Sequence, residues 1–255
     1  MYTIDMIGTE KKDKKLLLHI SKADFIKRMI FNNPDELKRC EQYLGLKGVA
    51  YHAVLANYIG LDDNGKIEYK KVQNMYVYDK RIRYILYKFL SALEEGIRGY
   101  ISNHYNSMDK IKSLSMKIYN AVEDGSNLSK ELENLGFNEL MQLTQKLNPD
   151  DLSMLFNGNQ NLEINLRAVR GLRNAVSHHR MLFVYEDFEE CTVDNLVSDS
   201  LTANVINLSN LINPFYKPFI INELNRAKND NDDPRFVDTI PSKAYFKLGE
   251  NNANK

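Results

Sequence analysis

Apolar residues recur every three to four positions along most of this chain, and that spacing is typical of α-helices that bury one face. The longest such segment spans residues 79–105, and its apolar positions are Ile82, Leu86, Phe89, Leu93, Ile97 and Tyr100. A second segment spans residues 162–183, and its apolar arc contains Leu162, Leu166, Val169, Leu172, Val176 and Phe183. We therefore predict an all-α protein in which both helices pack on a core.

Shorter helices are expected on both sides of these two segments, where helix-start residues and breakers frame the periodic stretches. Ser21 is a plausible N-cap, Gly45 is expected to close a helix, and Asn148-Pro149-Asp150 is expected to end one. The expected helices are residues 22–31, 35–44, 49–59, 108–122, 128–135, 138–147, 193–211 and 219–228.

The same pattern predicts three regions. Residues 1–70 are expected to form an N-terminal helical region that packs on the main bundle. Residues 1–18 are expected to be a solvated arm, with an edge strand or an RNA-contacting tail as the alternatives. Residues 71–228 form the main helical domain, with a peripheral insertion around 106–160. Residues 229–255 are rich in Asn, Asp and Lys, which predicts a polar, partly mobile tail.

The charge balance and the cysteine content of the chain exclude some classes of function. At 255 residues the chain can bury a core without covalent staples, and its 34 basic and 34 acidic residues balance. Contact with nucleic acid must therefore come from a local patch, which argues against bulk coating of DNA. Cys40 and Cys191 give neither metal-ligand spacing nor a disulfide framework, and the start lacks an apolar signal segment. We expect a soluble cytoplasmic protein with no membrane segment.

Polar chemistry is concentrated in residues 162–183. Asn174 and His178 lie at i and i+4 and so share a face of the predicted helix, while Arg173 falls at the border of the apolar arc. A guanidinium there stays charged and needs an anionic partner. No acidic residue occurs between Glu163 and Glu186, so the helix should form a local positive patch. The basic residues of this patch are Arg167, Arg170, Arg173, Arg180, His178 and His179.

The helix at 79–105 offers a partner for Arg173. A polar stripe beside its apolar arc contains Arg83, Tyr87, Glu94 and Arg98. Glu94 and Arg98 pair at i and i+4, and Glu94 is the candidate partner of Arg173. The alternative is a solvated surface pair, which contributes only about 0.3 to 0.5 kcal/mol.

The run Arg173-Asn174-Ala175-Val176-Ser177-His178 resembles the Arg, polar residue, three variable residues, His signature of the HEPN superfamily of RNA-cleaving helical domains. With His178-His179-Arg180 and the helix upstream, the chain resembles the Abi family of abortive-infection proteins. The resemblance covers roughly the middle half of the chain. Its further features are Asn57-Tyr58, Asp79, Arg83, Glu94, Arg98 and residues 134–147.

The resemblance implies a HEPN-like helical bundle with additional peripheral helices, a homodimer with a composite active site, and no cofactor or metal. It implies catalytic roles for Arg173, Asn174 and His178. Supporting roles would fall to Glu94, Arg98, Arg83 and His179, and RNA contacts to Arg167, Arg170 and Arg180. An antitoxin or a regulatory RNA is a possible partner. Relatives controlled by a nucleotidyltransferase carry a tyrosine where this chain has Arg180, so that form of control is not expected.

These residue types suit RNA cleavage because RNA carries its own nucleophile, the 2′-hydroxyl. His178 can move a proton near neutral pH, and Arg173 can hold the charge of the phosphorane. Asn174 could orient the substrate or fix the histidine tautomer. The expected products carry 2′,3′-cyclic phosphate and 5′-hydroxyl ends. The alternative is a non-catalytic RNA- or nucleotide-binding module in which the same side chains only grip phosphate.

Overall fold

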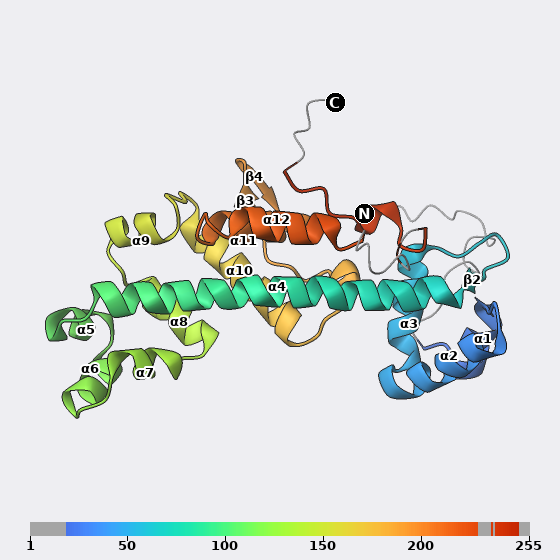
Figure 1. Ribbon diagram of the computed structural model, residues 1–255, viewed down its shortest axis with the longest axis horizontal. Coiled ribbons are helices and arrows are strands. Elements are labelled where there is room, and N and C mark those ends of the chain that lie inside the picture. Colours follow the sequence, from blue (N-terminus) through green and yellow to red (C-terminus); the bar gives the residue numbers. More distant parts are fainter. Residues whose placement is uncertain (1–18, 229–235, 237, 250–255) are drawn as a thin grey trace, which may run out of the picture. The chain divides into compact units, whose positions relative to one another are not determined.

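The computed structural model describes residues 19–228, 236 and 238–249. The arm predicted at 1–18 and part of the tail predicted at 229–255 lie outside these residues. The chain divides into two compact units, each described by itself below, and Figure 1 labels their elements. The first unit contains Met1–Arg81 and Ala227–Tyr245, and the second contains Ile82–Arg226 and Phe246–Lys255. The predicted division at 70 falls at the start of the long helix Tyr69–His104, whereas the boundary between the two units lies farther along that helix, after Arg81.

Two helices of the first unit begin at residues whose side chains cap them. Asp24 N donates to Ser21 Oγ (3.1 Å) at the start of the first helix, and Glu36 N donates to Asn33 Oδ1 (3.0 Å) at the start of the second. Its elements are α1 (Lys22–Arg28), β1 (Met29–Ile30), α2 (Pro34–Lys47), α3 (Val49–Ile59), β2 (Ile67–Glu68), the start of α4 (Tyr69–His104) and the 3₁₀ helix η4 (Ser242–Ala244). Strands β1 and β2 pair in parallel, with Met29 opposite Ile67.

Three sequence predictions in this unit fail at helix ends. The long helix was expected to begin at residue 79, but α4 begins at Tyr69. The first helix was expected to reach residue 31, but it ends at Arg28 because Met29 and Ile30 are extended and pair with β2. The second was expected to close at Gly45, yet α2 continues to Lys47 and closes at Gly48, whose φ of 81° favours glycine.

The second unit contains the rest of α4 and the elements that follow it. They are α5 (Met108–Leu114), α6 (Met116–Glu123), α7 (Leu128–Glu133), α8 (Phe137–Thr144), α9 (Pro149–Leu155), α10 (Leu162–Ser177), η2 (Leu182–Val184), β3 (Cys191–Val193), β4 (Leu196–Ser198), α11 (Leu201–Leu211) and α12 (Lys217–Arg226). Within this unit, α5, α6 and α7 gather near the C-terminal end of α4 (Figure 1). Helix α10 contacts α8, α11 and β3.

The predicted all-α class is confirmed, although the helix predicted at 193–211 is wrong over its first part. Residues 191–198 instead form the antiparallel β3–β4 hairpin. Asp194 (φ 50°) and Asn195 (φ 63°) occupy its two-residue turn, which requires positive φ at both positions. Ser200 then caps α11 by accepting a hydrogen bond from Ala203 N at 3.1 Å.

Further boundaries in this unit depart from the predictions. The helices expected at 128–135, 138–147 and 219–228 are observed as α7, α8 and α12 with bounds shifted by up to three residues. The helix expected at 108–122 is broken at Ser115, whose hydroxyl accepts from Ile118 N (3.4 Å) and starts α6. Asn148-Pro149-Asp150 was expected to end a helix, but α8 already ends at Thr144; Asn148 instead accepts from Asp151 N (2.8 Å) and opens α9.

The apolar arcs of the two longest predicted helices lie where the pattern placed them. On α4 the buried members are Ile82, Leu86, Phe89, Leu93 and Ile97, and on α10 they are Leu166, Val169, Leu172 and Val176. Large apolar residues of the predicted tail are buried too, namely Phe236 and Ile240 in the first unit and Phe246 and Leu248 in the second. Part of the segment that was predicted as a polar tail is therefore packed in the cores of the two units.

Candidate functional site

Helix α10 presents the predicted catalytic residues on its outer side. Asn174 and His178 are exposed, and the Arg173 side chain is 32% exposed. The α-helix ends at Ser177, and His178 forms its cap by donating its backbone N–H to the Asn174 carbonyl at 2.9 Å. Asn174 and His178 therefore follow each other along one face, one turn apart.

The chain reverses direction directly after His178. His179 has a φ of 56°, in the left-handed region, and its N–H donates to the Val176 carbonyl (3.1 Å). Arg180 N donates to the Ala175 carbonyl (2.9 Å), which completes a Schellman motif. The prediction that the helix extends to residue 183 is therefore wrong. His178 and His179 differ in backbone conformation, so only His178 continues the face of Asn174.

Glu94 joins α4 to α10. Its Oε1 lies 3.5 Å from Arg173 Nε, and its Oε2 lies 3.4 Å from a terminal nitrogen of Arg98. The Glu94 side chain is only 16% exposed, so the pair is not a solvated surface pair. Arg98 also donates to the carbonyls of Leu132 and Leu135, both at 3.1 Å. The predicted ion pair of Glu94 with Arg173 is confirmed.

A cavity of about 560 Å³ opens between α8 and α10. From α10 it is lined by Arg170, Gly171, Arg173 and Asn174, and from the other side by Gly136, Phe137, Asn138, Glu139 and Glu189. The Arg173 guanidinium carbon lies 5.4 Å from the centre of the Phe137 ring, so the ring restrains the guanidinium from one face. The cavity thus combines two arginines, an amide and two carboxylates.

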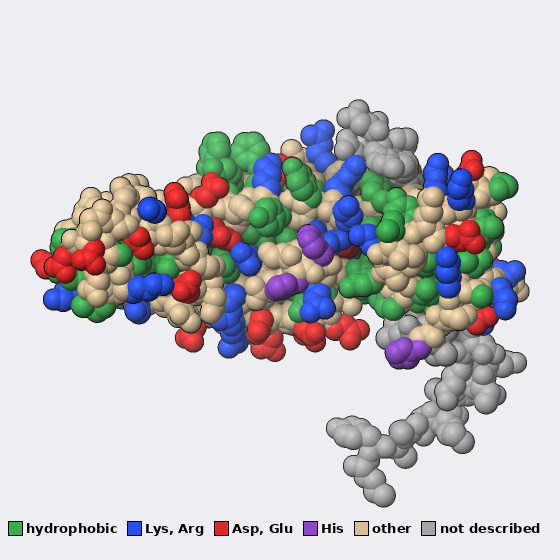
Figure 2. All heavy atoms as spheres, turned by 90° about the horizontal axis from the view of Figure 1, so that it is seen from below, with side chains coloured by type: hydrophobic (Ala, Val, Ile, Leu, Met, Phe, Trp, Pro, Cys, Tyr) green, Lys and Arg blue, Asp and Glu red, His purple; other side chains and the backbone are tan. Residues whose placement is uncertain are grey.

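The positive patch expected on α10 is weaker than its own sequence indicates. Arg167 Nε lies 3.6 Å from a Glu189 carboxylate oxygen, and Arg170 donates to Asn138 Oδ1 at 3.1 Å. Figure 2 likewise shows basic and acidic side chains interspersed on the face it displays. The patch prediction counted only residues next to one another in sequence, whereas Glu94 and Glu189 reach α10 from other segments.

The remaining predicted residues lie apart from this cavity. His178, His179, Arg180 and Arg167 are exposed but do not line it. Arg83 is buried and lies eleven residues before Glu94 on α4, about 16 Å along the helix axis. The structure brings Arg170, Arg173, Asn174 and Glu94 together, and it leaves Arg83 elsewhere.

Buried asparagines place Glu189, which sequence reasoning missed. Asn204 of α11 donates to the Glu189 carbonyl at 3.0 Å, and Thr192 N donates to Asn165 Oδ1 of α10 at 2.8 Å. Gly171 permits the close approach, because a Cβ there would lie 2.9 Å from Glu189 Cγ. Asparagines on the apolar side of predicted helices were the only sequence signal of this arrangement.

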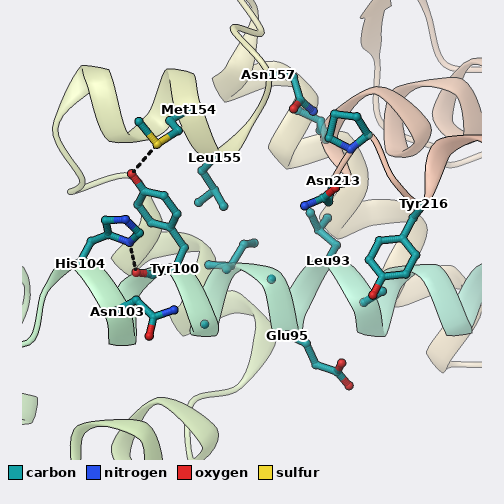
Figure 3. Close-up of a pocket in the computed structure, with 16 residues that line it drawn as sticks. Leu93, Glu95, Tyr100, Asn103, His104, Met154, Leu155, Asn157, Asn213 and Tyr216 are labelled. Carbon is teal, nitrogen blue, oxygen red and sulfur yellow. Dashed lines mark hydrogen bonds between the residues drawn. The ribbon is translucent and has the colours of Figure 1, made fainter.

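A second cavity in the same unit, of about 570 Å³, lies against α4 (Figure 3). Figure 3 shows the Tyr100 hydroxyl of α4 pointing to the Met154 sulfur of α9, 3.7 Å away. The His104 ring stacks on the Tyr100 ring, and His104 Nδ1 donates to the Tyr100 carbonyl at 2.9 Å. None of the predicted catalytic residues lines it. Beside it, Asp151 accepts hydrogen bonds from the Tyr100 hydroxyl (2.6 Å) and the Tyr105 hydroxyl (2.5 Å). Asp151 therefore joins α9 to the end of α4.

We expect Asp151→Asn to lower the free energy of unfolding by about 1.5 kcal/mol at pH 7, because two hydrogen bonds to a charged acceptor weaken. The hydrogen bond from Tyr100, followed by that from Tyr105, lowers the pKa of Asp151. A lowered pKa stabilises the fold above the unfolded value of about 4, and this contribution disappears as pH falls through the folded value.

Urea unfolding at several pH values measures this effect, and the gap between wild type and Asp151→Asn should close below about pH 4. Asp150→Asn is the matched control, because Asp150 is exposed and makes no ion pair within the described part of the chain. An equal loss of stability in both variants, or a gap independent of pH, would contradict this role.

No protein-family model, curated protein or solved structure matches the chain. The fold class and the geometry above therefore stand on the structure alone. None of the described helices combines the length and the apolar character needed to cross a lipid bilayer.

Proposed function

We propose that this chain is a metal-independent endoribonuclease of a phage-defence or toxin–antitoxin system, a member of the Abi family within the HEPN superfamily. One observation carries the proposal. The Glu94 carboxylate, largely shielded from water, holds Arg173 beside Asn174 at a cavity wall, one helical turn before the exposed His178. The proposal combines this geometry with the resemblance of the Arg173 to His178 motif.

Each group has a role in cleavage by the 2′-hydroxyl. Arg173 contacts Glu94 through Nε, and its two terminal nitrogens donate to none of the residues that the structure describes. A planar guanidinium can bind two phosphate oxygens. His178 is exposed, so its imidazole can take the 2′-hydroxyl proton or give one to the leaving 5′-oxygen. Asn174 lies between them in sequence and can hold the substrate. The expected products end in 2′,3′-cyclic phosphate and 5′-hydroxyl.

A second candidate is an RNA- or nucleotide-binding module without catalysis. Two features favour it: His178 does not line the cavity that Arg173 and Asn174 line, and Glu139 and Glu189 place carboxylates there. In such a module Arg173 would grip a phosphate, and no proton would move.

Incubation of RNA with the protein in excess chelator separates the candidates. We expect cleavage to persist, with fragments ending in 2′,3′-cyclic phosphate, because the 2′-hydroxyl and protein side chains supply the whole reaction. Cleavage that requires an added metal, or fragments with 3′-hydroxyl ends, would contradict the proposal. Binding without cleavage would favour the second candidate.

The proposed active species is a homodimer in which two copies of α10 face one substrate. Acid and base catalysis needs two proton-transfer groups, whereas each chain supplies one motif histidine, His178. We expect an inactive Arg173→Ala, His178→Ala double variant, added in excess, to exchange into wild-type dimers and suppress cleavage. A fully active monomer by light scattering, or activity that tracks the wild-type fraction despite subunit exchange, would remove the composite site.

A further inference from the structure

The first unit contains a cavity of about 180 Å³ between α2, α3 and α4 that the proposed nuclease does not use. Its walls include three tyrosines, one histidine and two lysines, namely Tyr43, Tyr69, Tyr76, His52, Lys47 and Lys80. All of these belong to one compact unit, so the cavity is formed within it.

Three of the four aromatic rings of this cavity, those of His52, Tyr69 and Tyr76, lie nearly parallel. The rings of His52 and Tyr76 have an interplanar angle of 8° with centroids 6.2 Å apart. The rings of His52 and Tyr69 make 18° with centroids 6.4 Å apart. Tyr69 is fully buried and His52 is 3% exposed, so the ring faces that a ligand can reach are those of Tyr76, which is half-buried, and Tyr43, which is 38% exposed. Accessible aromatic faces favour a planar ligand, because nucleic-acid bases stack on them.

Polar atoms at the cavity walls can form hydrogen bonds with the edge of a planar ligand. His52 is only 3% exposed, and its Nδ1 donates to the Gly48 carbonyl at 3.0 Å. Burial lowers the pKa of His52, so the neutral ring keeps Nε2 as an acceptor that no described residue engages. The Gln73 amide also lines the cavity and makes no hydrogen bond to a described residue. The cavity thus offers an acceptor from His52 and both donor and acceptor groups from Gln73.

Two cations accompany these rings. Lys47 at the end of α2 and Lys80 on α4 are exposed, and neither forms an ion pair with any residue that the structure describes. Flexible ammonium groups beside an aromatic cavity suit a ligand that carries a phosphate outside the stacked ring.

The volume decides which part of a ligand fits inside. A space of 180 Å³ corresponds to about six water molecules at about 30 Å³ each. One planar heterocycle fits that space, whereas its sugar and phosphate must remain outside, near the lysines. We propose that this cavity binds the base of a nucleotide, with Lys47 and Lys80 holding the phosphate. The nucleotide is either free or part of a single-stranded RNA, and the proposal is independent of cleavage by α10.

Isothermal titration calorimetry tests this with UMP, CMP, AMP and GMP, with the matching nucleosides, and with a 5′-phosphorylated single-stranded RNA. We expect saturable binding of at least one nucleotide and at least about tenfold weaker binding of its nucleoside. Lys47→Gln with Lys80→Gln should weaken nucleotide binding at least about tenfold. The matched control is Lys38→Gln with Lys70→Gln, which removes the same charge from exposed positions of the same two helices outside the cavity.

Tyr76→Leu, checked for an unchanged circular dichroism spectrum, should remove binding of the nucleotide and of the nucleoside alike, because it deletes a ring face. Binding of the RNA without binding of free nucleotides supports the site and assigns RNA as its source, provided that the Lys47 and Lys80 changes weaken it. The proposal is overturned if neither ligand binds, or if the control pair weakens binding as much as the cavity pair. Full binding by Tyr76→Leu would overturn it as well.

Discussion

Replacing His178 with alanine is expected to slow RNA cleavage by about 10² to 10⁴-fold, the range that a positioned proton-transfer group contributes. The expected cause is purely chemical, because the side chain of His178 is exposed and its backbone N–H bond to Asn174 does not depend on the imidazole. Unfolding by urea should therefore remain unchanged. The loss is measured with the chelator-treated RNA assay and end-group analysis.

His179 supplies the matched control. Its φ of 56° is a conformation that glycine adopts without steric cost, so His179→Gly should stabilise the fold by about 1 kcal/mol. The cleavage rate should stay within about twofold of wild type, since His179 turns away from the face of Asn174 and His178. If His178→Ala stays active while His179→Gly is inactive, the assignment of the proton-transfer group is wrong.

The sequence predicted helix faces better than helix ends. The buried arcs of α4 and α10 follow from a period of 3.6 residues. The same period placed Glu94 on the polar face of its helix, and the structure shows that this face contacts Arg173. Helix α3 was predicted with its observed bounds, Val49–Ile59, because the loop residues Asp62-Asp63-Asn64-Gly65 follow it. Periodicity predicts on which face of a helix a side chain lies. A contact between two helices can be predicted when the faces of both are predicted correctly, as for Glu94 and Arg173.

Other parts of the site depend on local conformations with weak sequence signals. The end of α10 was missed because a histidine, not a glycine, takes the left-handed position after it. The β3–β4 hairpin was missed because Val193 and Leu196 also fit a helical period. Glu189 comes close to α10 because the segment that contains it is hydrogen-bonded to buried asparagines of α10 and α11, and the spacing of the apolar residues in α10 does not indicate this contact.

Glu94→Gln is expected to lower both stability and cleavage. Loss of the carboxylate leaves Arg98 and Arg173, which are 21% and 32% exposed, without their shared counter-charge. A fully buried pair broken in this way costs about 3 to 5 kcal/mol, and partial exposure reduces our expectation to about 2 kcal/mol. Arg98 keeps its hydrogen bonds to two backbone carbonyls. We therefore expect the side chain of Arg173 to move more than that of Arg98.

Glu95→Gln is the matched control, since it makes the same change one residue along α4 at an exposed position that forms no ion pair with a described residue. Cleavage by Glu94→Gln should drop at least about tenfold while the pH profile keeps its midpoints, because Glu94 positions Arg173 and His178 still moves the proton. A shift of those midpoints would instead make Glu94 a proton-transfer group. An unchanged melting temperature together with an unchanged cleavage rate would show that Arg173 does not depend on the Glu94 carboxylate. The proposed active site would then be contradicted, because it is argued from this contact.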